Sequence, residues 1–318
     1  MGRFLLKRFL LIVPVFFGIT ILVYLLATLA PGNAVDILMA DPYSTLADME
    51  RKRVELGLEL PVYVQYWNWL VQLLQGNLGN SFRTYLPVWS MIGIRIVPTL
   101  VLTVSATVLT LIISIPLGTL AAYRPYSPGD YFSTGISFVG VSTPNFFIAL
   151  VLIYVFAVKL RILPMGGMFD TGSAGHNPGA LVRHIIMPAV VLSIQQIGAF
   201  TRHMRSSVLE VLGEDYIRTA KSKGLSNFMV VLKHGMRNAM IPIVTLLGVN
   251  IPFLIGGAVV TEQIFGWPGL GSLMVQSILM RDYPVIMGIT VVLSIAVLIG
   301  NIVVDVVYGL LDPRIRYN

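Results

Sequence analysis

The sequence predicts an all-α protein of six membrane-spanning helices, with both chain ends in the cytoplasm. Three observations support this fold class. The 318 residues are 56% hydrophobic and only 12% charged, whereas soluble domains carry about 25% charged residues. The apolar runs reach about 20 residues, the length that crosses a bilayer as a helix. Lys and Arg are concentrated in alternate loops, as the positive-inside rule requires.

The first span is expected at about residues 9–29, behind the cations Arg3, Lys7 and Arg8. Its apolar run is too long for a signal peptide, so we expect it to remain uncleaved. Residues 30–97 are charged enough to leave the membrane and are expected to form an extracytoplasmic loop. The loop should contain a capped helix starting near Ser44 and a second helix from Pro61 to Gln75.

Five further spans are expected at about residues 98–122, 131–158, 184–200, 239–260 and 284–311. Pro144 breaks the second of these, because proline removes a backbone donor and the freed carbonyl needs protein or water nearby. With the N-terminus inside, the inner loops and ends hold 13 Lys and Arg, and the short outer loops hold four. We therefore expect residues 1–318 to form one transmembrane domain.

Residues 214–242 form a long basic stretch between two spans, within an inner loop expected at 202–238. Glu214 and Asp215 favour the start of a short helix, and Lys221 and Lys223 favour its end, as the helix dipole requires. Gly224 suits the left-handed position that follows a helix. The expected local structure is helix, glycine, helix.

The first of these helices is only about two turns long, and a helix of that length is marginal alone. Tyr216, Ala220 and Gly224 fall on one face at i, i+4 and i+8. A small residue at 220 favours close approach of another backbone, so we expect this helix to dock on a partner. Ser226 is expected to cap the second helix. The alternative is a basic loop that only sets topology.

The run DYIRTAKSKGL at 215–225, followed by KHGMRNAMIP at 233–242, resembles the coupling loop of ABC importer permeases. It is most similar to the B-type permease subunit of oligopeptide, dipeptide and nickel importers. The general motif is Glu-Ala-Ala, three residues and Gly; here Arg218 stands in place of Glu, as in the peptide-importer form. Similar motifs cover nearly the whole chain: LAPG at 29–32, LGNS at 78–81, TPNF at 143–146, TEQIFGWPGLG at 261–271, RDYP at 281–284 and DPR at 312–314.

The resemblance implies the type I ABC importer permease fold and import of oligopeptides or dipeptides, with nickel or another substrate as the alternative. It implies a multi-pass protein of the bacterial inner (plasma) membrane, in contact with lipids. It also implies a second homologous permease, two ATPase subunits that bind ATP and magnesium, and an extracytoplasmic peptide-binding protein. The residues implied in coupling to the ATPases are Glu214, Asp215, Tyr216, Arg218, Ala220, Lys221, Lys223 and Gly224.

Several classes of function lack their sequence signature. No glycine is followed by lysine, so the chain has no phosphate-binding G-x-x-x-x-G-K-[ST] loop and is not expected to be an enzyme or to hold a cofactor. The four histidines have no i, i+4 partner, so no metal site is expected. The net charge of +7 is attributed to the inner membrane face rather than to nucleic acid.

Polar residues within the spans either line a pathway or bond the helices together. The candidates are Asn145, Gln195, Gln196, Asn250 and Asn301.

Gly256 and Gly257 favour either a gate or simple helix packing. Asp305 is interpreted as an interfacial residue. Trp267 either contacts the binding protein or anchors the outer interface. The rival classes are a secondary transporter or channel, which needs buried coupling carboxylates or inverted repeats, and an intramembrane enzyme.

Overall fold

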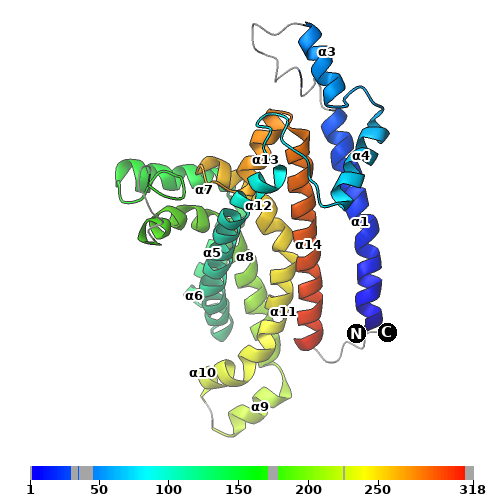
Figure 1. Ribbon diagram of the computed structural model, residues 1–318. Coiled ribbons are helices and arrows are strands. Elements are labelled where there is room, and N and C mark those ends of the chain that lie inside the picture. The colour runs from blue at the N-terminus through cyan, green and yellow to red at the C-terminus, as the bar shows by residue number, and fades with distance from the viewer. Residues whose placement is uncertain (1, 30–34, 36–45, 171–177, 225, 312–318) are drawn as a thin grey trace. The chain divides into compact units, whose positions relative to one another are not determined.

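The computed structural model describes residues 2–29, 35, 46–170, 178–224 and 226–311. Within these ranges the chain is helical, and no residue forms a β-strand. It divides into two compact units, and Figure 1 labels the helices of both. Unit 1 comprises residues 1–97 and 269–299, and unit 2 comprises residues 98–268 and 300–316.

Unit 1 holds the predicted first span and first loop. Its helices are α1 (Gly2–Leu29), α3 (Leu46–Glu55), α4 (Val62–Leu74), α13 (Leu270–Leu279), and the first parts of α5 (Val88–Tyr123) and α14 (Tyr283–Leu311). The predicted helix from Pro61 to Gln75 is confirmed by α4. The predicted cap at Ser44 lies outside the described residues. The core joins both stretches of sequence, through Leu78, Val88, Ile92, Leu270, Leu273, Val285 and Ile289.

Unit 2 is built around α8, the 35-residue helix Pro178–Leu212. Its other elements are α6 (Pro128–Ser142), α7 (Asn145–Leu152), the π-helical turn η1 (Ile153–Lys159), α9 (Asp215–Ser222), α10 (Asn227–Val230), the π-helical turn η2 (Val231–Gly235), α11 (Met236–Val249) and α12 (Ile251–Ile264). Helix α6 packs closely on α8, since a Cβ atom on Gly198 would lie 2.5 Å from the carbonyl oxygen of Ser137. Small residues permit this close approach of two helices in a membrane.

Among the described residues, four helices are long and apolar enough to cross a membrane: Leu10–Leu29, Val88–Tyr123, Pro178–Leu212 and Tyr283–Val303. The pair Pro128–Ser142 and Asn145–Lys159 makes a fifth span if it is counted as one. The chain bends by 103° between these two helices. The predicted break at Pro144 is thus confirmed.

The predicted span at 239–260 is divided between α11 and α12, each of 14 residues. A helix of that length rises about 21 Å, which is less than the roughly 30 Å of a bilayer core. Asn250 separates the two helices in a near-helical conformation, with φ −87° and ψ −6°. Pro252 lies in the first turn of α12, where its missing N–H breaks the helical hydrogen-bond pattern.

Candidate functional site

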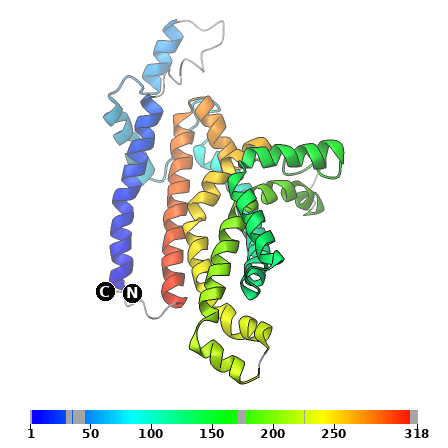
Figure 2. The same ribbon diagram turned by 180° about the vertical axis from the view of Figure 1, so that it is seen from behind.

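The basic segment forms the predicted helix, glycine and helix. Helix α9 follows α8 after a short turn, and the extended backbone of Glu214 precedes it. The carbonyl of Glu214 accepts hydrogen bonds from the backbone N–H groups of Ile217 (3.1 Å) and Arg218 (3.3 Å). Gly224 has a φ of +82°, which confirms its left-handed position. Figures 1 and 2 both show α9 and α10 beyond the ends of α8 and α11.

The second part of the segment continues into the next long helix without an open loop. The hydroxyl of Ser226 accepts a hydrogen bond from the backbone N–H of Met229 at 3.3 Å, which confirms the predicted cap. Helix α10, η2 and α11 then follow one another directly. The helical path from residue 227 to residue 249 therefore links the glycine turn to α11.

Helix α9 is held by its own chain. Ile217 is fully buried and Ala220 is 7% exposed. Both pack in a cluster with Ala122, Phe200, Met204, Val208, Val211, Val230, Val231, Ala239 and Ile243. Full burial of an isoleucine is worth about 1.5–3 kcal/mol, enough to offset the marginal stability of so short a helix.

This packing revises the face expected to dock. Ala220 points into unit 2 and is not open to another protein. Tyr216 is half-exposed, and its hydroxyl accepts a hydrogen bond from the side-chain amide of Asn238 at 2.8 Å. Gly224 is exposed, and a Cβ there would have no heavy atom within 4 Å.

The open face of α9 is charged. Asp215 and Arg218 are 95% and 76% exposed in their side chains, and their closest N–O distance is 3.4 Å. A pair this exposed contributes at most about 1 kcal/mol to stability. The exposed charged side chains on α9 and at its two ends are Glu214, Asp215, Arg218, Lys221 and Lys223. The arrangement presents an acidic start and a basic end to a partner.

An ion pair that sequence reasoning missed ties α6 to α8 before α8 reaches α9. Arg205 donates from Nε and Nη2 to the two carboxylate oxygens of Asp130, both at 2.7 Å. The backbone N–H of Tyr126 donates to Asp130 Oδ2 at 2.9 Å. Two parallel N–H···O bonds fix the orientation of the guanidinium relative to the carboxylate and also strengthen the ion pair. In the sequence, Ser127 and Pro128 with an acidic residue in the first helical turn predict the start of a helix. They do not predict that Asp130 pairs with Arg205.

The candidate pathway residues occupy separate places in unit 2. Asn145 begins α7, and Gln195 and Gln196 lie on α8, half-buried and buried respectively. The side chain of Asn250 donates to the carbonyl of Leu246 at 2.7 Å, a contact within its own helix turn. Gly256 and Gly257 lie within α12. Their assignment to a pathway stays a prediction.

A second group that the sequence did not reveal involves residues near the start of unit 2. Glu262 is fully buried and accepts a hydrogen bond from the hydroxyl of Thr99 at 2.7 Å. Trp267 is also fully buried, and its indole N–H donates to the carbonyl of Pro98 at 2.9 Å. Trp267 therefore packs within unit 2 and is not a surface aromatic, contrary to both readings of the sequence.

His184 shows how one of the four histidines is used. Its ring nitrogen Nδ1 lies 3.0 Å from the carbonyl oxygen of Gly166, and Nε2 lies 3.2 Å from Asp170 Oδ1. In the described part of the chain, no group of three or more His, Asp or Glu side chains is placed to hold a metal ion. His184 joins the loop before α8 to that helix.

The long apolar helices indicate an integral membrane protein. Two family models cover the sequence. Residues 114–317 match the binding-protein-dependent transport system inner membrane component, and residues 1–107 match the N-terminal part of such membrane components. The chain belongs to this family and is a permease subunit of an ABC importer.

Curated relatives and one solved structure agree with the family. The oligopeptide transport system permease protein AppB of Bacillus subtilis is 45% identical over 318 residues, all of both chains. The glutathione transport system permease protein GsiC of Escherichia coli is 39% identical over 317 residues, again covering both chains fully. The dipeptide transport system permease protein DppB of Escherichia coli is 35% identical over 337 residues, covering 100% of this chain and 99% of its own.

The fold is shared with a structure of the MetNI methionine ABC transporter in an inward-facing conformation. The TM-score is 0.56 at 18% sequence identity, over 70% of this chain and 96% of that chain. The likeness concerns the fold, which is that of a type I importer permease. Family membership places the chain among ABC importer permeases rather than secondary transporters or channels.

Proposed function

We propose that the chain forms half of the translocation pathway of an importer for oligopeptides or dipeptides. The observation that carries the substrate class is the full-length identity of 35–45% to permeases named for oligopeptides, glutathione and dipeptides. Glutathione is itself a tripeptide, so all three names describe amide-linked substrates.

The proposed topology has six spans with both ends in the cytoplasm of a bacterial cell, in the inner membrane. The charge distribution supports it, because the short loops and ends assigned to the inside hold 13 Lys and Arg against four outside. In this topology α11 and α12 together form one span, and α6 with α7 forms another. Residues 30–97 lie outside, and α9 lies inside.

The proposed partners are a second homologous permease, two ATPase subunits and an extracytoplasmic peptide-binding protein. ATP and magnesium are bound by the ATPases. Coupling is assigned to the exposed charges of α9, namely Glu214, Asp215, Arg218, Lys221 and Lys223, with Tyr216, Ala220 and Gly224 holding their geometry. Candidate pathway residues are Asn145, Gln195, Gln196, Asn250, Gly256 and Gly257.

Uptake into proteoliposomes tests the function. The complete transporter, with its binding protein, should accumulate a labelled peptide only when ATP is supplied on the ATPase side. Uptake by this chain alone under a proton or sodium gradient would refute the proposal. If the transporter accumulates nickel but no peptide, the importer assignment stands and the proposed peptide substrate is refuted.

Crosslinking tests the role of α9. The sequence contains no cysteine, so Arg218→Cys introduces one exposed thiol. It should crosslink to an ATPase subunit, whereas Gln75→Cys in the first loop should not. Equal crosslinking of the ATPase subunit by Arg218→Cys and Gln75→Cys would show that α9 does not dock on the ATPase.

A further inference from the structure

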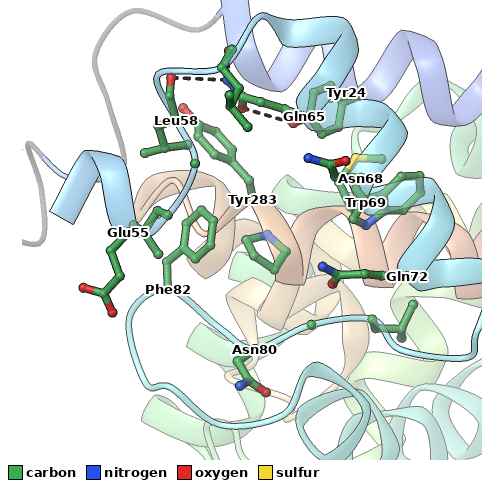
Figure 3. Close-up of a pocket in the computed structure, with 17 residues that line it drawn as sticks. Tyr24, Glu55, Leu58, Gln65, Asn68, Trp69, Gln72, Asn80, Phe82 and Tyr283 are labelled. Carbon is green, nitrogen blue, oxygen red and sulfur yellow. Dashed lines mark hydrogen bonds between the residues drawn. The ribbon is translucent and has the colours of Figure 1, made fainter. Parts of the chain in front are cut away.

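Unit 1 contains a pocket that the coupling and pathway residues do not explain. It has a volume of about 320 Å³ and lies among α1, α4, the turn at 55–60, the loop at 78–82 and the start of α14 (Figure 3). That volume is at the lower end of the roughly 300–1,000 Å³ found for small-molecule sites. The candidate pathway residues do not line it.

Helix α4 presents an unusual face to this pocket. Gln65, Asn68, Trp69 and Gln72 line it, and their spacing of i, i+3, i+4 and i+7 places them on one side of the helix. A helix that only packs against its neighbours has apolar residues at this spacing. Here three of the four residues are carboxamides, each with one acceptor oxygen and two donor hydrogens.

One of the three carboxamides shapes the pocket. Gln65 donates to the carbonyl oxygens of Leu58 (3.2 Å) and Leu60 (2.7 Å), and its side-chain oxygen accepts from the hydroxyl of Tyr24 at 3.2 Å (Figure 3). These bonds fix the 58–60 turn and α1 against α4. Gln65 therefore positions the walls and has no donor left for a ligand.

The other two carboxamides are unused. Within the described residues, the side chains of Asn68 and Gln72 form no hydrogen bond, and both project from α4 into the pocket (Figure 3). Between them on the same face, the buried indole Nε1 of Trp69 has no acceptor among the described residues. A buried donor without an acceptor is rare in proteins. It indicates that something besides the described residues completes the wall.

The opposite wall is aromatic and rigid. The rings of Phe82 and Tyr283 pack edge to face with centroids 6.4 Å apart. Asp282, which is 4% exposed, holds both residues in place. Its carboxylate accepts hydrogen bonds from the hydroxyl of Ser81 and from the backbone N–H of Phe82 at 2.9 Å.

The chemistry of the lining selects the ligand. The 17 described lining residues include no Lys, Arg or His, so they offer no cation to a phosphate or a lipid headgroup. Glu55 is the one carboxylate among these described residues, and its side chain points away from the centre of the pocket (Figure 3). Side-chain amides without hydrogen bonds, next to aromatic rings, suit a ligand that has a neutral amide backbone and an apolar side chain.

We propose that this pocket binds a short peptide. Asn68 and Gln72 hydrogen-bond to its backbone N–H and C=O groups, while the rings of Trp69 and Phe82 cover an apolar side chain. The inference rests on the peptide-import function proposed above and deepens it. It assigns the permease a peptide site of its own, between residues 55–82, which are proposed to lie outside the membrane, and the adjoining parts of α1 and α14.

The test uses the complete transporter in lipid nanodiscs, without the binding protein and without nucleotide. The dipeptide Ala-Phe is titrated and its binding is followed by calorimetry. We expect saturable binding that weakens about tenfold or more in Asn68→Ala/Gln72→Ala, since two hydrogen bonds are lost. Gln75→Ala is the matched control, because this exposed amide follows α4 and does not line the pocket.

Tryptophan fluorescence gives a second readout on the same sample. The change in emission on adding Ala-Phe should be lost in Trp69→Phe and kept in Trp67→Phe, since Trp67 lies outside the lining and is 63% exposed. The midpoint of thermal unfolding of each variant shows whether it is folded.

Three results would overturn the proposal: no saturable binding of Ala-Phe at millimolar concentration, equal affinity in the folded Asn68→Ala/Gln72→Ala variant, or loss of binding-protein docking in that variant without any peptide binding. The last result would make the pocket a protein-docking surface. ATP-driven peptide uptake by the unaltered transporter is measured in parallel. If uptake occurs while the pocket fails its test, the proposed function stands and this inference alone falls.

Discussion

Replacement of Gly198 by alanine should destabilise unit 2 by separating α6 from α8. The added Cβ would lie 2.5 Å from the carbonyl oxygen of Ser137 and 3.0 Å from Val141 Cγ2, whereas ordinary contact begins at 3.4 Å. The carbonyl belongs to a helical backbone and cannot turn aside. The helices must therefore move apart by nearly an ångström, which weakens contacts along the whole interface.

The expected cost of this overpacking is about 1–3 kcal/mol. Gly135, on the partner helix α6, is the control, because a Cβ there would meet no heavy atom within 4 Å. Gly135→Ala should be neutral or stabilise by up to about 1 kcal/mol through helix propensity. The free energies of unfolding of the two variants should thus differ by about 1–4 kcal/mol.

The assay is equilibrium unfolding of the purified chain in mixed micelles, followed by the fluorescence of its four tryptophans. Gly140→Ala serves as the reciprocal test from the other helix, since its Cβ would lie 2.8 Å from the carbonyl oxygen of Ile194. If Gly198→Ala and Gly135→Ala unfold within about 0.5 kcal/mol of each other, the close approach does not limit stability and the reasoning fails.

Three further predictions concern other contacts. In a double-mutant cycle of Asp130→Ala and Arg205→Ala, the coupling free energy should be about 1–3 kcal/mol. If the two substitutions change the free energy of unfolding additively, the two side chains do not act as a pair. Gly224→Val should lower ATP-driven uptake, because a branched side chain at a φ of +82° costs about 1–2 kcal/mol. Gly224→Asn should retain uptake. Equal uptake by the two variants would show that coupling does not depend on the left-handed turn. Asp282→Ala should lower the free energy of unfolding by about 1.5–3 kcal/mol, because it leaves the Ser81 hydroxyl without its acceptor. Asp282→Asn should recover part of the lost stability. An unchanged unfolding midpoint in Asp282→Ala would show that this hydrogen bond does not stabilise the fold.

Local features of the chain could be predicted from sequence because their causes are local. Gly224, Ser226 and Pro144 each act through their own backbone or through a residue within one turn, and all three are found as expected. The helix at 62–74 was also predictable, since its ends are marked by Pro61 and Gly76.

The contacts between distant segments could not be predicted. Asp130 and Arg205 are 75 residues apart, Thr99 and Glu262 are 163 apart, and no spacing rule connects them. The face of α9 illustrates the same limit. Periodicity grouped Tyr216 with Ala220 and suggested an open face, but the chain folds Ala220 back against its own core beside Ile217.

In the proposed topology, the length of α8 also determines how far α9 lies from the membrane. Arg202 is the first cation after the apolar stretch of this helix, and from there to Leu212 the helix rises by about 15 Å without a break. Each turn added or removed in this stretch would shift α9 by about 5.4 Å along the helix axis. In the proposed complex, an ATPase subunit docked on α9 therefore lies at a distance from the lipid that is set by the number of residues in α8.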